Sequence, residues 1–257
     1  MTSEQAPGTE SPSGLELSPH HKRWLLRTAE RTAEDAANEL PGWLRPHRGE
    51  QRWSVLLVVI LAIVLQVLLP SDLILGPRAI VPGIEAALCL ILLIADPGEI
   101  HKSSQRMRRF SLLLIAVLAI TNTASTIELV HVIVTGEHVS AVKILASGAA
   151  IWITNIIAFA LWYWEFDRGG PLARALHPRP RPDFLFPQMS DERIDPGWHA
   201  TFFDYLYVSF TNASAFSPTD TMPITRWAKM LMMAQSLISL VTVALVAARA
   251  VNVLPLH

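Results

Sequence analysis

The sequence has a single cysteine, almost no net charge and no motif of a soluble enzyme. Cys89 lies within an apolar run, so the chain has no internal disulfide and the thiol is expected to act as a small apolar side chain. A net charge of −1 gives nucleic-acid binding no electrostatic support. The GxSxG, HExxH, Walker and dinucleotide-binding glycine patterns are absent, and the 9 histidines are scattered. The sequence therefore predicts no enzyme, no metal site and no cofactor.

Long apolar runs are what the chain has in abundance. Hydrophobic residues make up 51% of it and concentrate in five runs, at 53–70, 79–95, 110–135, 141–163 and 226–253. Crossing a membrane core of about 30 Å takes about 20 mostly apolar residues. One or two such runs fit the core of a soluble protein, but five in series do not. The sequence therefore predicts an all-α, multi-pass membrane protein with five transmembrane helices.

The remaining segments divide the chain into four regions. Residues 1–20 are rich in Ser, Pro, Glu and Gly and predict a disordered tail. Residues 21–52 predict a cytoplasmic amphipathic helix and a linker, with the helix either on the membrane surface or packed on the bundle. Residues 53–140 contain helices one to three, and 141–257 contain helix four, a long loop and the last helix. Nothing at the N-terminus resembles a cleavable signal, so the first helix is expected to remain as an anchor.

Lysine and arginine predict how the runs are oriented. They cluster before the first run, between the second and third, and between the fourth and fifth, where Arg168 and Arg174 are among them. The opposite ends hold only Arg78, Lys143 and Arg249. By the positive-inside rule the N-terminus is cytoplasmic and the C-terminus outside, in a bacterial cytoplasmic membrane. The TrpTyrTrp run at 162–164 predicts an aromatic belt at the inner end of helix four.

The gap of about sixty residues between the fourth and fifth runs is unlike an ordinary loop. Its last part, 201–221, is too apolar and aromatic for a loop and too short to span. Such a segment before a final spanning helix is typical of a re-entrant pore loop. Charge distribution places it on the cytoplasmic side. The proline- and arginine-rich stretch at 177–183 predicts an extended element, either a stiff spacer or a docking motif.

Polar residues inside the runs need a reason, because an acid near the bilayer centre costs about 2.5–3.5 kcal/mol on insertion scales. Four of them are expected in the outer half of the bundle, where they form either a proton- or cation-handling cluster or a packing network. Two amides share the middle depth, and a hydrogen bond between them on adjacent helices is the simple explanation. This predicted intramembrane polar cluster consists of Glu85, Glu128, His131, Lys143, Asn122 and Asn155.

Helix order and one motif carry a resemblance in the C-terminal half. From about Gly148 to Leu254 the sequence gives an apolar helix, a loop, an aromatic half-helix, SerPheThrAsnAlaSerAlaPheSerProThrAsp and an apolar helix. That order resembles the potassium-channel pore module, with Thr211 at the filter threonine, 215–217 at its GlyTyrGly and Asp220 near its following acid. AspTyrLeuTyr at 204–207 with AlaPheSerProThrAsp also resembles an uncharacterised bacterial family of predicted multi-pass membrane proteins.

One departure from the channel pattern has a direct consequence. No glycine follows Gly197. A potassium filter stacks backbone carbonyls toward the ion and uses left-handed backbone positions that need glycine. Potassium selectivity is therefore not expected.

The leading functional hypothesis is passage of an ion or small solute through a channel-like pore, with the chain assembled as a homo-oligomer in the lipid bilayer. Alternatives are a non-conducting scaffold or partner subunit, and proton-coupled transport through Glu128 and His131. In the last helix, polar residues at i, i+4 and i+7 line either an aqueous path or a helix–helix seam. The residues expected to line the pore are Asp204, Thr211, Asn212, Ser214, Ser217, Thr219, Asp220, Gln235, Ser239 and Thr242.

Overall fold

The computed structural model describes residues 27–28, 40–47, 49–50, 53–70, 79–95, 105–135, 140–176, 181–191, 193–214 and 220–253. The chain divides into two units, Met1–Leu40 and Pro41–His257. In the first, Arg27 and Thr28 are helical, and the expected tail and most of the expected amphipathic helix lie outside the described residues. The described residues from Pro41 onward belong to the second unit.

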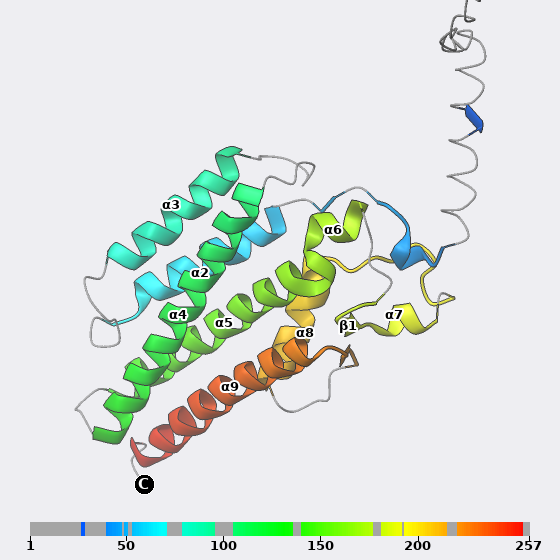
Figure 1. Ribbon diagram of the computed structural model, residues 1–257. Helices are drawn as coiled ribbons and strands as arrows, with labels where there is room; N and C mark the ends of the chain where they lie inside the picture. The colour runs from blue at the N-terminus through cyan, green and yellow to red at the C-terminus, as the bar shows by residue number, and fades with distance from the viewer. Residues whose placement is uncertain are drawn as a thin grey trace, which may run out of the picture. The chain divides into compact units, whose positions relative to one another are not determined.

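The apolar runs form helices at the predicted places. The five helices are α2 (Trp53–Leu68), α3 (Ile80–Ala95), α4 (Gln105–Thr135), α5 (Ala141–Phe166) and α9 (Arg226–Val253) (Figure 1). Three shorter helices, α6 (Pro171–Leu176), α7 (Pro187–Ser190) and α8 (Phe202–Ser214), lie between α5 and α9. In the part of the chain that the structure describes, the strands are β1 (Phe184–Leu185) and β2 (Met222–Pro223), which pair antiparallel. The predicted all-α class is therefore confirmed.

Length separates the long helices into two groups. Three stretches are long and apolar enough to cross a membrane: Arg106–Thr135, Val142–Gly169 and Arg226–Arg249. Helices α2 and α3 have 16 residues each. At 1.5 Å per residue each is about 24 Å long, less than a core of about 30 Å. Length and composition thus support three spans, and the other two helices are shorter than an upright crossing needs.

Helix α5 is the centre of the bundle. It packs against α2, α4, α8 and α9, and its own residues Ala160, Leu161 and Tyr163 are buried in the main apolar cluster. α4 and α9 both run antiparallel to it, as Figure 1 shows. Because α5 is covered on most sides, its surface has room for few contacts with lipid.

Side-chain contacts bring the ends of several elements together. The Nε atom of Arg108, in the first turns of α4, is 3.3 Å from Oε1 of Glu165 at the end of α5. Oε2 of Glu50, just before α2, accepts hydrogen bonds of 3.0 Å from Trp164 Nε1 and from the backbone N–H of Phe202, the first residue of α8. We call this end of the bundle the charged end. It collects the segments that the sequence analysis placed on one side of the membrane.

Helix α8 starts at the charged end and stops inside the bundle. The carbonyl of Ala213, in its last turn, accepts a hydrogen bond of 3.4 Å from Nε1 of Trp152, in the middle part of α5. The chain is back at the charged end by β2, where Met222 pairs with Leu185 and the N–H of Ile224 donates to the carbonyl of Asp183 at 2.8 Å. The chain therefore enters and leaves the bundle at the same end. Residues 215–219, with Ser217 and Thr219, lie outside the described residues.

A close approach of α5 to α9 gives a test of this packing. A β-carbon at Gly148 would lie 2.5 Å from Cγ2 of Val246. We expect Gly148→Ala to lower stability by about 1–3 kcal/mol through overpacking, and Val246→Ala to restore much of the loss. Thermal unfolding in detergent measures both. Gly83→Ala is the matched control, since a β-carbon there meets nothing within 4 Å. Equal effects of the two glycine substitutions, or additive effects of Gly148→Ala and Val246→Ala, would contradict the contact.

Candidate functional site: a polar seam and a buried charge cluster

A band of hydrogen-bonded polar side chains joins α5, α8 and α9. We call it the polar seam, and it consists of Asn155, Tyr163, Ser209, Asn212, Gln235, Ser236 and Ser239. Gln235, Ser239 and Thr242 form the i, i+4, i+7 stripe, and all three are buried. Gln235 and Ser239 bond to side chains of neighbouring helices, which favours the helix–helix seam, while Thr242 bonds to a carbonyl of its own helix.

Gln235 is the hub of the polar seam. Its Nε2 donates to the carbonyl of Ser209 at 2.9 Å and to the hydroxyl of Ser209 at 2.6 Å. Its Oε1 accepts from the hydroxyl of Tyr163 at 2.5 Å and from Nδ2 of Asn212 at 2.8 Å. An amide has two donors and two acceptor positions, so all of its hydrogen-bonding capacity is used.

Asn155 pairs with α9 rather than with α4. Its Nδ2 donates to the hydroxyl of Ser239 at 2.9 Å. The predicted hydrogen bond between Asn122 and Asn155 is therefore wrong: Asn122 is buried on α4, and its backbone carbonyl accepts from Thr126. Equal depth in the sequence did not reveal that α9 packs closer to this face of α5.

The C-terminal carbonyls of α8 also have partners in the same chain. The carbonyl of Thr211 accepts from Ser214 Oγ at 3.0 Å, that of Asn212 from Ser236 Oγ at 3.4 Å, and that of Ala213 from Trp152 Nε1 at 3.4 Å. The last carbonyls of a helix have no partner within it. Side chains therefore satisfy the carbonyls of three of the last four residues of α8.

Other residues of the predicted pore lining have structural roles in one chain. Oδ2 of Asp204 accepts from both the backbone N–H (2.7 Å) and the hydroxyl (2.8 Å) of Thr201, which caps α8 in the manner of a capping box. The hydroxyls of Thr211 and Thr242 bond to carbonyls of their own helices. Asp220 is exposed.

The predicted cluster in the outer half does not assemble. Glu85 is fully buried, and its partner is Gln66 of α2: with the amide nitrogen facing the carboxylate, the distances are 3.0 and 3.2 Å. His131 and Lys143 are exposed and Glu128 is half-buried. Within the described ranges, Glu128, His131 and Lys143 form no ion pair with one another.

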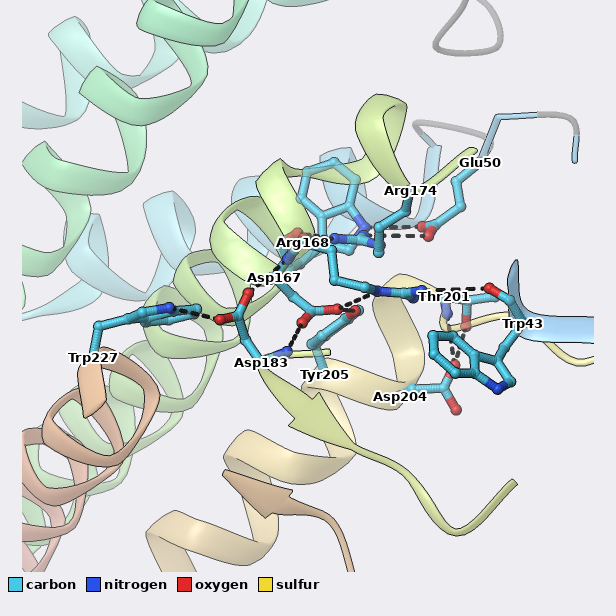
Figure 2. Close-up of polar contacts among 11 residues, drawn as sticks. Trp43, Glu50, Asp167, Arg168, Arg174, Asp183, Thr201, Asp204, Tyr205 and Trp227 are labelled. Carbon is cyan, nitrogen blue, oxygen red and sulfur yellow. Dashed lines mark hydrogen bonds and ion pairs between the residues drawn. The ribbon is translucent and has the colours of Figure 1, made fainter. Parts of the chain in front are cut away.

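A second group of polar residues lies at the charged end, as Figure 2 shows. We call it the charge cluster, and it consists of Glu50, Asp167, Arg168, Arg174, Asp183 and Tyr205. The turn after α5 creates it: Arg168 has a φ of 52°, and Gly169 and Gly170 follow at 92° and 100°. Glycine adopts such left-handed backbone positions without the steric cost that other residues have.

Asp167 is the centre of the charge cluster. It has no exposed surface and accepts hydrogen bonds from Arg168 Nε at 3.3 Å, Tyr205 Oη at 2.5 Å and the backbone N–H of Asp183 at 3.0 Å. Asp183 in turn accepts from the backbone N–H of Arg168 at 2.8 Å and from Trp227 Nε1 at 2.9 Å. One carboxylate thus connects the end of α5, the segment before β1, α8 and, through Asp183, the start of α9.

Arg174 is buried beside it. Its Nη1 donates to the carbonyls of Trp164 at 2.6 Å and Asp167 at 3.0 Å, its guanidinium lies 4.9 Å from the ring centre of Tyr205, and Nη2 is 3.8 Å from Oε1 of Glu50. Burial lowers the pKa of Arg174, but the nearby oxygens of Tyr205, Asp167 and Glu50 raise it more, so it stays charged. Burial raises the pKa of Glu50, and Arg174 opposes that rise.

These positions correct two sequence-based expectations. Arg168 and Arg174 entered the positive-inside count as loop charges, whereas each is 2% exposed and paired within the protein. Tyr163 and Trp164 were expected in an aromatic belt, whereas both are buried, against Gln235 and Glu50. The sequence signal for the charge cluster was the AspArgGlyGly run at 167–170, in which a carboxylate and a guanidinium precede a tight turn.

The class that these observations define is a helical protein with three helices long and apolar enough to span a membrane. Among the described residues, no group of three or more His, Cys, Asp or Glu side chains is placed to hold a metal ion. Comparison with protein-family models, with curated proteins and with solved structures finds no match.

Breaking the charge cluster gives a large expected effect. Arg174→Met leaves the carboxylate of Glu50 without its cation and the two carbonyls without their donor, and removing one partner of a buried pair costs about 3–5 kcal/mol. Thermal unfolding measures the loss. Arg193→Gln is the control, because its ion pair with Asp191 is on the surface and should matter little. Equal stability of the two variants would show that the cluster does not hold the helices together.

The pH dependence of segment 41–50 gives another test. The ring of His47 stacks on that of His199 with ring centres 4.0 Å apart, and the backbone N–H of His47 donates to the carbonyl of Ala175 at 3.1 Å. Burial, followed by His199, Arg174 and Arg168, lowers the pKa of His47 from 6.5 to about 4. Because the pKa of His47 is lower in the docked segment than in the released one, its neutral ring contributes fully to docking above pH 6.5. This contribution is lost as the pH falls toward 4.

We therefore expect release of segment 41–50 to rise on the order of tenfold at pH 5 over pH 8 because of His47 alone. The raised pKa of Glu50 acts in the opposite direction, so the measurement compares wild type with His47→Gln. Hydrogen exchange of backbone amides at 41–47 reports the release. An identical pH profile in the two proteins would contradict the assigned role of His47.

Proposed function

We propose that the protein is a five-span, non-conducting scaffold or partner subunit of the bacterial cytoplasmic membrane, with α8 as a re-entrant half-helix. The observation that carries the proposal is that the side chains of the polar seam bond mostly to one another, with every donor and acceptor of Gln235 in use, although the Oδ1 atom of Asn155 is buried without a partner. A conducting lining must offer polar groups to the solute in place of its water. Here the side chains of Asn212, Ser214 and Gln235, which were expected to do so, bond to other groups of the same chain, as do the carbonyls of Thr211 and Asn212.

The exposed surfaces of the two short helices support the five-span part of the proposal. Leu57 and Leu68 on α2 are 57% and 69% exposed, and Leu90 and Ile94 on α3 are 54% and 72% exposed. Large apolar side chains in such number on one surface favour contact with lipid. Helices shorter than the hydrocarbon core are accommodated by local thinning of the bilayer at modest cost.

Passage between copies of the chain is a second candidate, and one observation favours it. The order of a long helix, a half-helix that stops inside the bundle, and a second long helix resembles the pore module of potassium channels. In those channels the pore lies on the axis of an oligomer. The exposed faces of α8 and α9 are apolar, with Phe203, Phe210 and Leu237 each about half or more exposed, and suit contact between copies. Ions would then pass the segment between α8 and β2.

Flux measurements in liposomes distinguish the two candidates. Purified protein is reconstituted and tested under potassium, sodium and chloride gradients, beside Ser214→Ala, Asp220→Ala and Gln235→Leu, with gramicidin as a positive control for the vesicles. We expect no flux from folded wild-type protein. We expect a loss of thermal stability in Gln235→Leu, since it removes one hydrogen-bond partner from each of Tyr163, Ser209 and Asn212. Flux that both Ser214→Ala and Asp220→Ala alter would reject the scaffold and establish a pore.

A further inference from the structure

Exposed cations gather where two long helices begin. The opening residues of α4 and α9 carry four exposed basic side chains, which we call the basic rim: Arg106, Arg109, Arg226 and Lys229. Their neighbour Arg108 is 48% exposed and is paired with Glu165. Within the residues described, none of the four rim side chains forms an ion pair.

Helix electrostatics do not explain the basic rim. The N-terminal end of a helix carries a partial positive charge, so it favours acids and disfavours cations. Neither α4 nor α9 has an acid in its first turn to offset this. Four cations at disfavoured positions, each without an internal partner, call for negative charge from outside the chain.

The end of α5 places the two halves of the basic rim on either side of it. Glu165 contacts Arg108 of α4, and Phe166 packs against Trp227 of α9 with ring centres 5.6 Å apart. Trp162 stacks on Phe166 at 4.8 Å. Aromatic rings of this kind collect at the level of lipid headgroups. Two carboxylates that contact the starts of α4 and α9 have other partners, since Glu165 is 5% exposed beside Arg108 and Asp183 accepts from Trp227 and Arg168.

Apolar side chains follow directly along the same faces. Leu113 lies one turn beyond Arg109 and is 50% exposed, while Met230 and Met233 follow Arg226 and are 62% and 63% exposed. A ligand that contacts both features therefore has an anionic head and long apolar chains. A soluble phosphate compound would match only the first.

We propose that the basic rim, with the aromatic residues between its halves, is a binding site for anionic phospholipid. The headgroup phosphate contacts the cations of α4 and α9, and the acyl chains lie along Leu113, Met230 and Met233. Lysine or arginine near a membrane surface attracts anionic lipid strongly enough that losing one such side chain weakens binding about fivefold. This inference rests on the membrane location given under Proposed function.

The test measures binding of phosphatidylglycerol and of phosphatidylcholine to the detergent-purified full chain by native mass spectrometry. We expect wild type to prefer phosphatidylglycerol, each single change among Arg106→Gln, Arg109→Gln, Arg226→Gln and Lys229→Gln to weaken that preference about fivefold, and added salt to reduce it. Arg181→Gln with Arg193→Gln is the control for exposed arginines elsewhere and should leave the preference unchanged. A variant in which Arg106, Arg109 and Arg226 are replaced by Lys, and Lys229 by Arg, keeps each charge. It should therefore keep the preference for phosphatidylglycerol.

Three results would overturn the site. The first is equal binding of phosphatidylglycerol and phosphatidylcholine by wild type. The second is an undiminished preference for phosphatidylglycerol in the glutamine variants. The third is binding of glycerol phosphate, which has the headgroup without the acyl chains, as strong as that of phosphatidylglycerol. Reconstitution into phosphatidylcholine vesicles distinguishes failure of the lipid site from failure of the proposed membrane location. A chain that inserts there without preferring anionic lipid loses only the site, whereas one that does not insert contradicts the proposed membrane location.

Discussion

The rest of the bundle depends on the hydrogen bonds that one buried carboxylate, that of Asp167, accepts. It is fully buried and accepts hydrogen bonds from Arg168, Tyr205 and Asp183. Burying a charge is costly unless it is paired and hydrogen-bonded. Elements far apart in the sequence must therefore meet there, and their meeting fixes where α5 ends and where α8 begins. The polar seam then sets the depth at which α8 stops.

The two polar groups act on different parts of one small module. The charge cluster holds α8 at its first turns through Tyr205, while Gln235 holds it through Ser209 and Asn212. A half-helix fixed at two levels has little freedom to slide or rotate between α5 and α9. Rigidity of this kind suits a structural element. It would equally fit a pore helix, where an inner end must keep a fixed position relative to neighbouring copies.

The helices followed from the sequence because apolar runs of about 20 residues leave few alternatives. The bounds of α9 agree with the prediction, and α4 starts at Gln105 rather than at residue 110 because its polar opening residues continue the helix. The sequence did not predict which helices the polar side chains contact. Asn155 was matched to Asn122 by depth, but depth says nothing about which neighbouring helix faces a given side chain. Arg168 looked like a loop charge because the AspArgGlyGly run indicates a turn but does not indicate that the turn buries its own arginine.

The position of Gln235 has a consequence for biosynthesis. Ribosomes complete α8 before they reach α9, so the hydrogen-bonding groups of Ser209 and Asn212 exist for some time without the amide that later satisfies them. A short helix with unsatisfied polar groups gains little from entering the bilayer alone. In the membrane protein proposed above, insertion of α8 would therefore wait for the last long helix. A chain truncated before α9 would leave the side chains of Ser209 and Asn212 without the amide of Gln235.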